Sequence, residues 1–202
     1  MAEILLLGTG NRDKAAELAT LLDGLPWDVR CLKDFPDVEE PEEDGDTFEA
    51  NACKKALYYG AHFDVACVAD DSGLCVDALD GAPGVYSARY AGEDCSYGDN
   101  NEKLLQALSD TPWHERGAHF ACCAAFAPRG ATACQVMHGT VAGHIAVEPS
   151  GARGFGYDPL FVPSGEERTF AEMTPGEKHA ISHRGRAFTA LRALLESIHG
   201  TD

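Results

Sequence analysis

Two adjacent carboxylates, Asp70 and Asp71, directly follow the apolar run 65–69. A short run rich in Val and Ala is typical of a buried strand, so the sequence predicts a strand that ends at these acids. Buried carboxylates need a positive partner, and divalent metals bind such oxygens at the carboxyl ends of strands in α/β sheets. Ser72 and Gly73 favour a tight turn with outward-facing N–H groups. The motif indicates metal-assisted chemistry on a phosphorylated substrate.

A second candidate is the segment from Thr9 to Lys14, where a glycine turn leads into a predicted helix with Asn11 at its N-cap. Helix N-termini bind anions, and a lysine in the first helical turn is more easily explained if an anion lies there. The alternative is an ordinary strand-to-helix turn with a surface lysine. The pattern is neither a Walker loop nor a dinucleotide fingerprint.

A third candidate is the helix predicted from Thr47 to about His62, with a capping box formed by Asp46 and Glu49. Thr47, Asn51 and Lys55 are spaced by four, so they share one face of this helix. That face presents a hydroxyl, an amide and an ammonium to a phosphate chain. A solvated helix face is the alternative.

The acidic segment 37–46 precedes this helix and is predicted to be a loop. Magnesium binds a few carboxylates together with phosphate oxygens and waters. Glu42 and Glu43 from the loop, meeting Asp70 and Asp71, suit that ligand set. The alternative is a loop that is merely solvated.

Residues in the C-terminal part of the sequence are suited to binding a flat ring such as a nucleotide base. Phe155 lies between two glycines and can stack on a base, and Asp158 can accept hydrogen bonds from ring N–H groups. Lys178 and the run 182–185 follow, in which Arg184 can donate to a carbonyl. A core-anchoring Phe and a structural His183 are the alternatives.

The elements that position these residues alternate between strands and helices. Strands are predicted at 4–7, 65–69, 118–127 and 133–141, the last two as an antiparallel pair joined at 128–130. Helices are predicted from Asn11, from Thr47, over 100–108 and at the C-terminal end. This order favours an α/β fold with a mixed sheet, and the 202 residues are read as one catalytic domain.

Composition excludes several classes of protein. The net charge of −17 disfavours binding of long nucleic acids, although a local cluster of cations and metal still suits a small anion. Eight cysteines without C-x-x-C spacing read as small buried hydrophobes in a reducing compartment. No apolar stretch is long enough to span a bilayer and no basic leader precedes the first strand, so a cytoplasmic location is expected.

Taken together, these motifs resemble the inosine triphosphate pyrophosphatase family nearly from end to end, and the bacterial branch most closely. The resemblance is carried by six segments in order: 9–14, 47–56, 69–74, 81–90, 154–159 and 182–185.

The resemblance implies a homodimer with an elongated mixed sheet flanked by helices, two lobes around a central cleft, and magnesium-dependent hydrolysis of ITP, dITP and XTP. Asp71 would be the general base and a metal partner, and Glu42 a second metal ligand. The residues implied to hold the phosphates are Thr9, Gly10, Asn11, Arg12, Asp13, Lys14, Lys55 and Ser72. Those implied to hold base and sugar are Phe155, Gly156, Tyr157, Asp158, Lys178, His183 and Arg184.

Base choice has a physical route, because hypoxanthine and xanthine offer an oxygen acceptor where adenine offers an amino donor. A donor such as Arg184 would favour the former, whereas guanine must be rejected at its two-amino group. Two other functions are compatible with the sequence: a Maf-like pyrophosphatase of modified pyrimidine triphosphates, and a nucleotide-binding sensor without catalysis. The many metal-type carboxylates disfavour the sensor.

Overall fold

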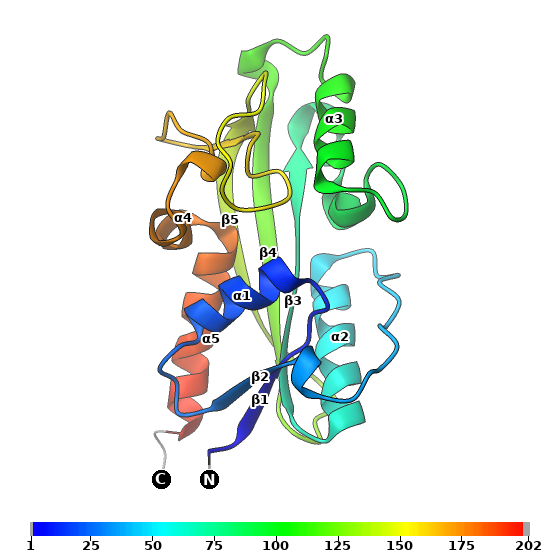
Figure 1. The fold of residues 1–202 in the computed structure, drawn as a ribbon, viewed down its shortest axis with the longest axis vertical. Coiled ribbons are helices and arrows are strands. Elements are labelled where there is room, and N and C mark those ends of the chain that lie inside the picture. The colour runs from blue at the N-terminus through cyan, green and yellow to red at the C-terminus, as the bar shows by residue number, and fades with distance from the viewer. Residues whose placement is uncertain (1, 200–202) are drawn as a thin grey trace. The chain divides into compact units, whose positions relative to one another are not determined.

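The computed structural model describes residues 2–199, which form an α/β fold around one six-stranded mixed sheet (Figure 1). The strands are β1 (Ile4–Leu7), β2 (Asp28–Cys31), β3 (Ala66–Val76), β4 (Gly117–Ala127), β5 (Gln135–Ile145) and β6 (Phe161–Pro163). The helices are α1 (Arg12–Leu21), α2 (Phe48–Phe63), α3 (Tyr97–Ala107), α4 (Pro175–Ile181) and α5 (His183–His199). The predicted fold class is confirmed.

The strand order is β2-β1-β3-β4-β5-β6. β1 pairs in parallel with β2 and with β3, whereas β5 and β6 are antiparallel. β4 and β5 are neighbours joined by only the short segment 128–134, and so short a connection requires the predicted antiparallel pairing.

The chain divides into two compact units. Among the described residues, unit 1 comprises 2–71, 122–139 and 184–199, and unit 2 comprises 72–121 and 140–183. β3, β4 and β5 contribute residues to both units.

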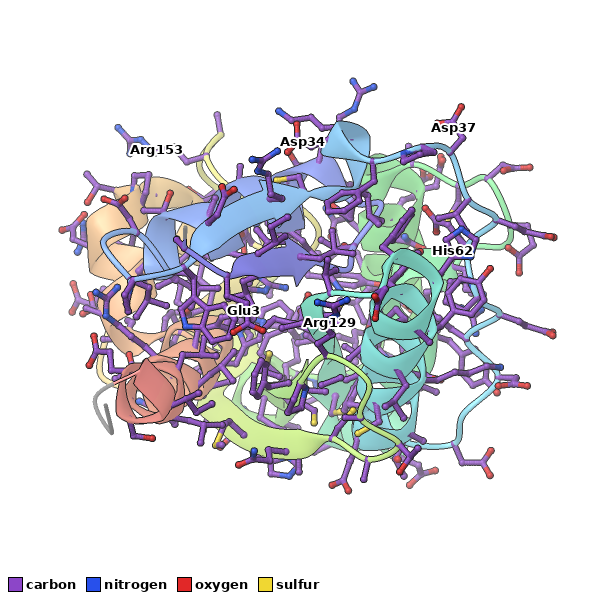
Figure 2. The ribbon with its side chains drawn as sticks, turned by 90° about the horizontal axis from the view of Figure 1, so that it is seen from below. Glu3, Asp34, Asp37, His62, Arg129 and Arg153 are labelled. Atoms are coloured by element: carbon purple, nitrogen blue, oxygen red, sulfur yellow. The ribbon has the colours of Figure 1, made fainter. Side chains whose placement is uncertain are left out.

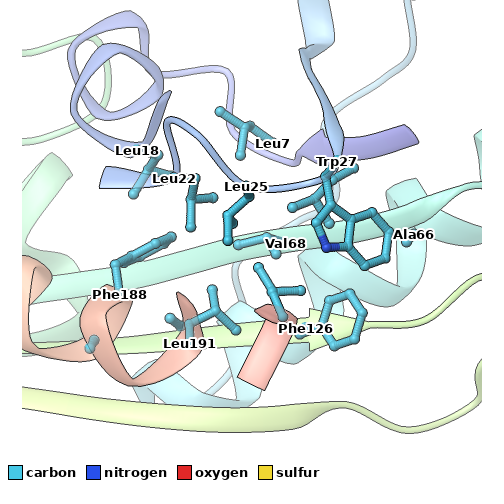
Figure 3. Packing of buried hydrophobic residues seen from close by; sticks show 14 of the residues in the cluster. Leu7, Leu18, Leu22, Leu25, Trp27, Ala66, Val68, Phe126, Phe188 and Leu191 are labelled. Atoms are coloured by element: carbon cyan, nitrogen blue, oxygen red, sulfur yellow. The ribbon is translucent and has the colours of Figure 1, made fainter. Parts of the chain in front are cut away.

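Alternation along the strands builds two layers of helices in unit 1. Leu5 and Leu7 pack in a cluster with α1 and α5, whereas Leu6 packs on the opposite face against Tyr59 of α2. Trp27 closes the first cluster with its ring edge against Phe126, 6.1 Å between centroids (Figure 3). α1 and α5 therefore cover one face of this part of the sheet and α2 the other (Figure 1).

Unit 2 has its own core. Leu104 and Leu108, from α3 and its C-cap, pack with apolar residues of β3, β4 and β5 and of the segment 157–173. Arg116 is buried here and donates to the carbonyl oxygens of Leu108, Thr111 and Ala146, which ties the end of α3 to the start of β4.

Several other charged side chains lie at the surface. Glu3, Asp34 and Arg129, labelled in Figure 2, are exposed, and Arg129 pairs with Asp64 at the end of α2. Within residues 2–199, no helix is long and apolar enough to cross a bilayer.

Cysteines are all free thiols, and three of them, Cys67, Cys122 and Cys123, are buried as predicted, whereas the other five are partly exposed. Burial raises the pKa of Cys123 and of Cys134 to about 12, so neither is a ready thiolate.

Three predicted details are wrong. β3 does not end at Asp71: it continues through Ser72 and Gly73 to Val76, so no tight turn forms there. α2 is capped by Thr47, whose hydroxyl accepts a hydrogen bond from the N–H of Ala50, instead of by a box starting at Asp46. α3 begins at Tyr97, three residues before the predicted start.

The missed start of α3 carries a recognisable signal. Ser96 and Asp99 form a capping box, in which each side chain accepts a hydrogen bond from the other residue's N–H.

Candidate active site

Asp70 and Asp71 lie in the middle of β3 and therefore point to opposite faces of the sheet. Asp70 has the same parity as Ala66 and Val68, which face α1 and α5, whereas Asp71 has the parity of Ala69, which faces α2. Both side chains are buried. The strand period thus separates two carboxylates that are adjacent in sequence.

On the α2 face, Asp71 receives a hydrogen bond from Asn51 Nδ2 at 3.1 Å, and Lys55 Nζ lies 3.7 Å from its other oxygen. Lys55 also pairs with Glu43 of the acidic segment. Burial would lower the pKa of Lys55, but Asp71, Glu43 and Asp70 outweigh it, so the pKa is raised and the ammonium form is favoured.

Burial also raises the pKa of Asp71, although Lys55, Lys14 and the bond from Asn51 oppose the shift. A carboxylate whose pKa moves toward neutrality is a better proton acceptor than an exposed one. The geometry is therefore compatible with the predicted role of Asp71 as the general base.

Thr47, Asn51 and Lys55 were predicted from their spacing to face a phosphate chain, but not all three lie beside Asp71. Asn51 does, and its Oδ1 also accepts a hydrogen bond from the N–H of Gly45 at 2.8 Å, which ties the acidic segment to α2. Thr47 serves as the helix cap instead. Lys54, next to the predicted phosphate ligand Lys55, pairs with Asp44 at the surface.

On the opposite face, Asp70 lies 3.5 Å from Lys14 Nζ and 3.4 Å from Arg184 Nε. Arg184 Nη1 also donates to Glu17 at 2.5 Å. Burial disfavours the guanidinium charge of Arg184, but Asp70 and Glu17 raise its pKa all the same. Two acids and two cations from α1, β3 and α5 thus form one buried network.

Glu17 was missed by the sequence analysis. It lies three residues after Lys14 on α1, so both side chains are on the same helix face, and that spacing is the signal that marks it.

The turn before α1 is held by hydrogen bonds to the side chains of Asn11, the N-cap of the helix, and Thr9. Asn11 Oδ1 accepts hydrogen bonds from the N–H groups of Asp13 and Lys14, and Thr9 Oγ1 accepts one from Asn11. Two helix N–H groups predicted to face an anion are therefore already bonded. Gly10 faces the acidic segment, because a Cβ there would lie 1.8 Å from Glu40 Oε1.

Of the two glutamates of the acidic segment that were considered as metal ligands, the structure places Glu43 closer to Asp71. Glu43 lies there across Lys55, whereas Glu42 is exposed and bonds to no residue in the described part of the chain. Within residues 2–199, no three His, Cys, Asp or Glu side chains are grouped to hold a metal alone. Magnesium needs only one or two protein carboxylates when phosphates supply the rest, and the ammonium between Asp71 and Glu43 marks a place for a cation.

The residues predicted to hold the base and sugar, except Arg184, lie in unit 2. Asp158 Oδ2 accepts from Lys178 Nζ at 2.6 Å and from the N–H of Phe155 at 2.9 Å. The same ammonium lies 5.0 Å from the centroid of the Phe155 ring. Gly154 adopts φ +71°, and a Cβ there would meet Asp158 Oδ2 at 2.0 Å, so the loop requires glycine.

Two of the residues predicted to hold the nucleotide base and sugar are part of the core. Tyr157 is buried and its hydroxyl donates to the carbonyl of Ser87 at 3.0 Å. His183 stacks on Phe120, with 4.5 Å between ring centroids.

Ser72, which was predicted to hold the phosphates, is a partly buried residue within β3.

Comparison with known proteins gives one consistent family. The Ham1 family profile matches residues 5–194. A protein of Geobacter sulfurreducens named dITP/XTP pyrophosphatase is 49% identical over 191 residues, 95% of this chain and 96% of that protein. One of the same name from Exiguobacterium sibiricum is 48% identical over 197 residues, 97% and 98% of the two chains.

Solved structures agree with this result. A HAM1 protein from Coxiella burnetii superposes with a TM-score of 0.86 at 40% identity, covering 98% of this chain and 100% of that one. A dITP/XTP pyrophosphatase from Mycobacterium abscessus gives 0.75 at 46% identity, covering 93% and 98%.

Proposed function

Because the chain belongs to the Ham1 family, we propose that it hydrolyses ITP, dITP and XTP to the monophosphate and pyrophosphate. The resemblance inferred from the sequence motifs is thereby confirmed. The protein is a nucleoside triphosphate pyrophosphatase, and its biological role is to remove deaminated purine nucleotides from the nucleotide pool. The observation that carries the proposal is near-full-length identity of almost one half to relatives with this name.

Unit 1 supplies the groups for phosphoanhydride hydrolysis. Lys14 and Lys55 carry buried or half-buried ammonium groups, each beside a carboxylate of β3, and suit the negative charge of a triphosphate. Asp71 takes the proton from the attacking water. That water adds across the bond between the α- and β-phosphates, which releases pyrophosphate. Stabilising charge on the phosphate oxygens is the main catalytic contribution in phosphoryl transfer.

Magnesium is the proposed cofactor, with Asp71 as one ligand and Glu42 as the other. The structure supports Glu43 as a further carboxylate close to Asp71, because both flank the ammonium of Lys55. When bound, the metal would neutralise charge on the phosphates and lower the pKa of a bound water.

Phe155, Asp158 and Lys178 of unit 2 are the groups proposed to hold the base. Phe155 offers a ring face for stacking, and Lys178 lies close to it, held by Asp158. Arg184 remains our proposed donor to the six-oxygen of the purine. Its guanidinium is oriented by Asp70 and Glu17, and such charge-assisted pairs fix geometry well.

The assay that tests the proposal is hydrolysis of a panel of nucleotides with magnesium, read out for pyrophosphate and for orthophosphate. ITP, dITP and XTP are expected to give pyrophosphate at rates far above those of ATP and GTP. Release of orthophosphate, or faster turnover of methylated UTP or CTP, would contradict it. Calorimetric binding of ITP without turnover would assign the protein to the sensors instead.

The homodimer implied by the family resemblance is proposed as the form in solution, together with a cytoplasmic location. Sedimentation velocity of the purified chain checks the first, since a species of twice the 21.6 kDa chain mass is expected.

A further inference from the structure

Helix α3 places two side chains against the Gly154–Asp158 loop of unit 2. Tyr97 and Asn101 are four residues apart and share one face of the helix. The Tyr97 ring lies 5.9 Å from the Phe155 ring at an interplanar angle of 37°. Asn101 Nδ2 donates to the carbonyl oxygen of Gly156 at 3.0 Å. Tyr97 thus contacts Phe155, the residue predicted to stack on the base, and Asn101 contacts Gly156, the residue after it.

The hydrogen bond from Asn101 to this carbonyl is made at a cost in free energy, which arises at the other end of the amide. Because a carbonyl oxygen requires a donor, the amide nitrogen must face Gly156, which leaves Oδ1 on the other side. That Oδ1 is buried and accepts no hydrogen bond from any residue between positions 2 and 199. A buried acceptor without a donor is unfavourable, so the side chain is not explained by its contribution to stability.

The neighbouring asparagine shows the contrast. Asn100 Oδ1 accepts from the N–H of Ala91 at 2.7 Å, and its Nδ2 donates to the carbonyl of Ala88 at 3.0 Å. Asn100 is 2% exposed and uses both ends of its amide to hold the segment before α3. It is a structural residue, and it offers a matched control.

The loop that Asn101 contacts needs such support. Gly154 and Gly156 both have positive φ, +71° and +63°, and glycine is the residue with the most freedom to leave a given conformation. Asp158 fixes the first half of the loop through the N–H of Phe155. Asn101 fixes the carbonyl group of Gly156, the residue that follows Phe155.

We propose that Tyr97 and Asn101 are positioning residues that hold Phe155 in the orientation for stacking on the purine ring. The inference rests on the proposed function, since the purine is that of the substrate. Preorganising a binding loop removes the cost of ordering it when the ligand arrives. Losing either contact therefore weakens binding of the base and leaves the hydrolytic step unchanged.

The experiment measures steady-state hydrolysis of ITP, inhibition by tripolyphosphate, and melting temperature for four variants. Tripolyphosphate carries no base, so it probes the phosphate-binding residues alone. For Asn101→Ala we expect KM for ITP to rise about fivefold, the effect of one lost hydrogen bond, with kcat within about twofold. The inhibition constant of tripolyphosphate should not change.

Three further variants sharpen the test. Asn101→Asp keeps the shape but has no donor when ionised, so its KM should rise at least as much as that of Asn101→Ala. Tyr97→Leu should also raise KM for ITP alone. Asn100→Ala should lower the melting temperature more than Asn101→Ala does, because it leaves two backbone groups without partners.

Three outcomes would overturn the proposal: an unchanged KM in Asn101→Ala, a tripolyphosphate constant that rises by the same factor, or a wild-type KM in Asn101→Asp. Wild-type turnover in the same assay tests the proposed function separately. If the wild type does not hydrolyse ITP, calorimetric Kd values for ITP in the same variants replace KM and decide the positioning role.

Discussion

Replacement of each of the two neighbouring aspartates of β3 by asparagine should affect different properties of the protein. Stability should depend on Asp70, and turnover on Asp71. Asp70 is fully buried and is the ion-pair partner of Lys14 and one of two for Arg184. Asp70→Asn keeps the shape and removes the charge. Breaking a buried pair by deleting one partner costs about 3–5 kcal/mol, and we expect about 3 kcal/mol because Glu17 still pairs with Arg184. For a chain of this size that corresponds to a fall in melting temperature of roughly 6–12 °C.

Asp71→Asn should leave stability nearly unchanged. Burial raises the pKa of Asp71, which means that its ionised form is partly disfavoured in the folded state. Removing that charge offsets the loss of the contact with Lys55, which keeps Glu43 as a partner. We expect a change within about 1 kcal/mol in the free energy of unfolding. Turnover of ITP should fall by about 10²–10⁴-fold, the range for loss of a general base.

The assay is a pair of measurements on each variant: thermal unfolding followed by circular dichroism, and pyrophosphate release at saturating ITP well below the melting temperature. The reasoning is refuted if both variants lose stability to the same extent. It is also refuted if Asp71→Asn retains wild-type turnover, because the base would then be another group.

Four other changes have defined outcomes. Lys55→Ala should lower kcat/KM for ITP about 100-fold or more and also destabilise the fold, because Asp71 loses a cation; kinetics and thermal unfolding check this. Chelation with EDTA should abolish turnover, and magnesium should restore it, with little change in melting temperature. Gly151→Ala should cost at least about 2 kcal/mol in chemical denaturation, because φ is +83° and a Cβ would lie 2.4 Å from the backbone of Ala171. Glu177 caps α4 and its pKa is lowered to about 2 by Thr174 and Arg168, so its stabilisation is present above about pH 4.3 and is lost toward pH 2. The melting temperature of Glu177→Gln should therefore lie below that of wild type at pH 7 and converge with it near pH 2.

Local signals in the sequence were sufficient for most elements of the fold. The apolar run at 4–7 and the cap at Asn11 correctly predict β1 and α1, and the 128–130 turn correctly predicts the β4–β5 pair. These features depend on neighbouring residues only. The α/β class follows from the alternation of such elements, which is why it was predictable without knowledge of any long-range contact.

The end of β3 was not predictable in this way. An apolar run that stops at two acids is typical of a strand end, because charged side chains are costly to bury. The structure buries Asp70 and Asp71 inside the strand, because cations that are distant in the sequence meet them. Arg184, which pairs with Asp70, is 114 residues away. Local sequence contains no record of such partners. The same limit explains why the pairing of Glu17 with Arg184 and that of Glu43 with Lys55 were not predicted.

Once β3 is continuous, the division of labour between its two acids follows from geometry alone. A strand places successive side chains on opposite faces, so Asp70 and Asp71 cannot both contact one metal ion through adjacent positions. The face with α1 and α5 presents two cations and a second acid, and there Asp70 balances charge. The face with α2 presents one lysine shared by two carboxylates, and there Asp71 is the acid with a raised pKa. Exchange of the two roles would require a register shift of one residue, which would also turn Val68 and Ala69 to the wrong cores. The apolar residues of β3 therefore determine which aspartate is available for catalysis.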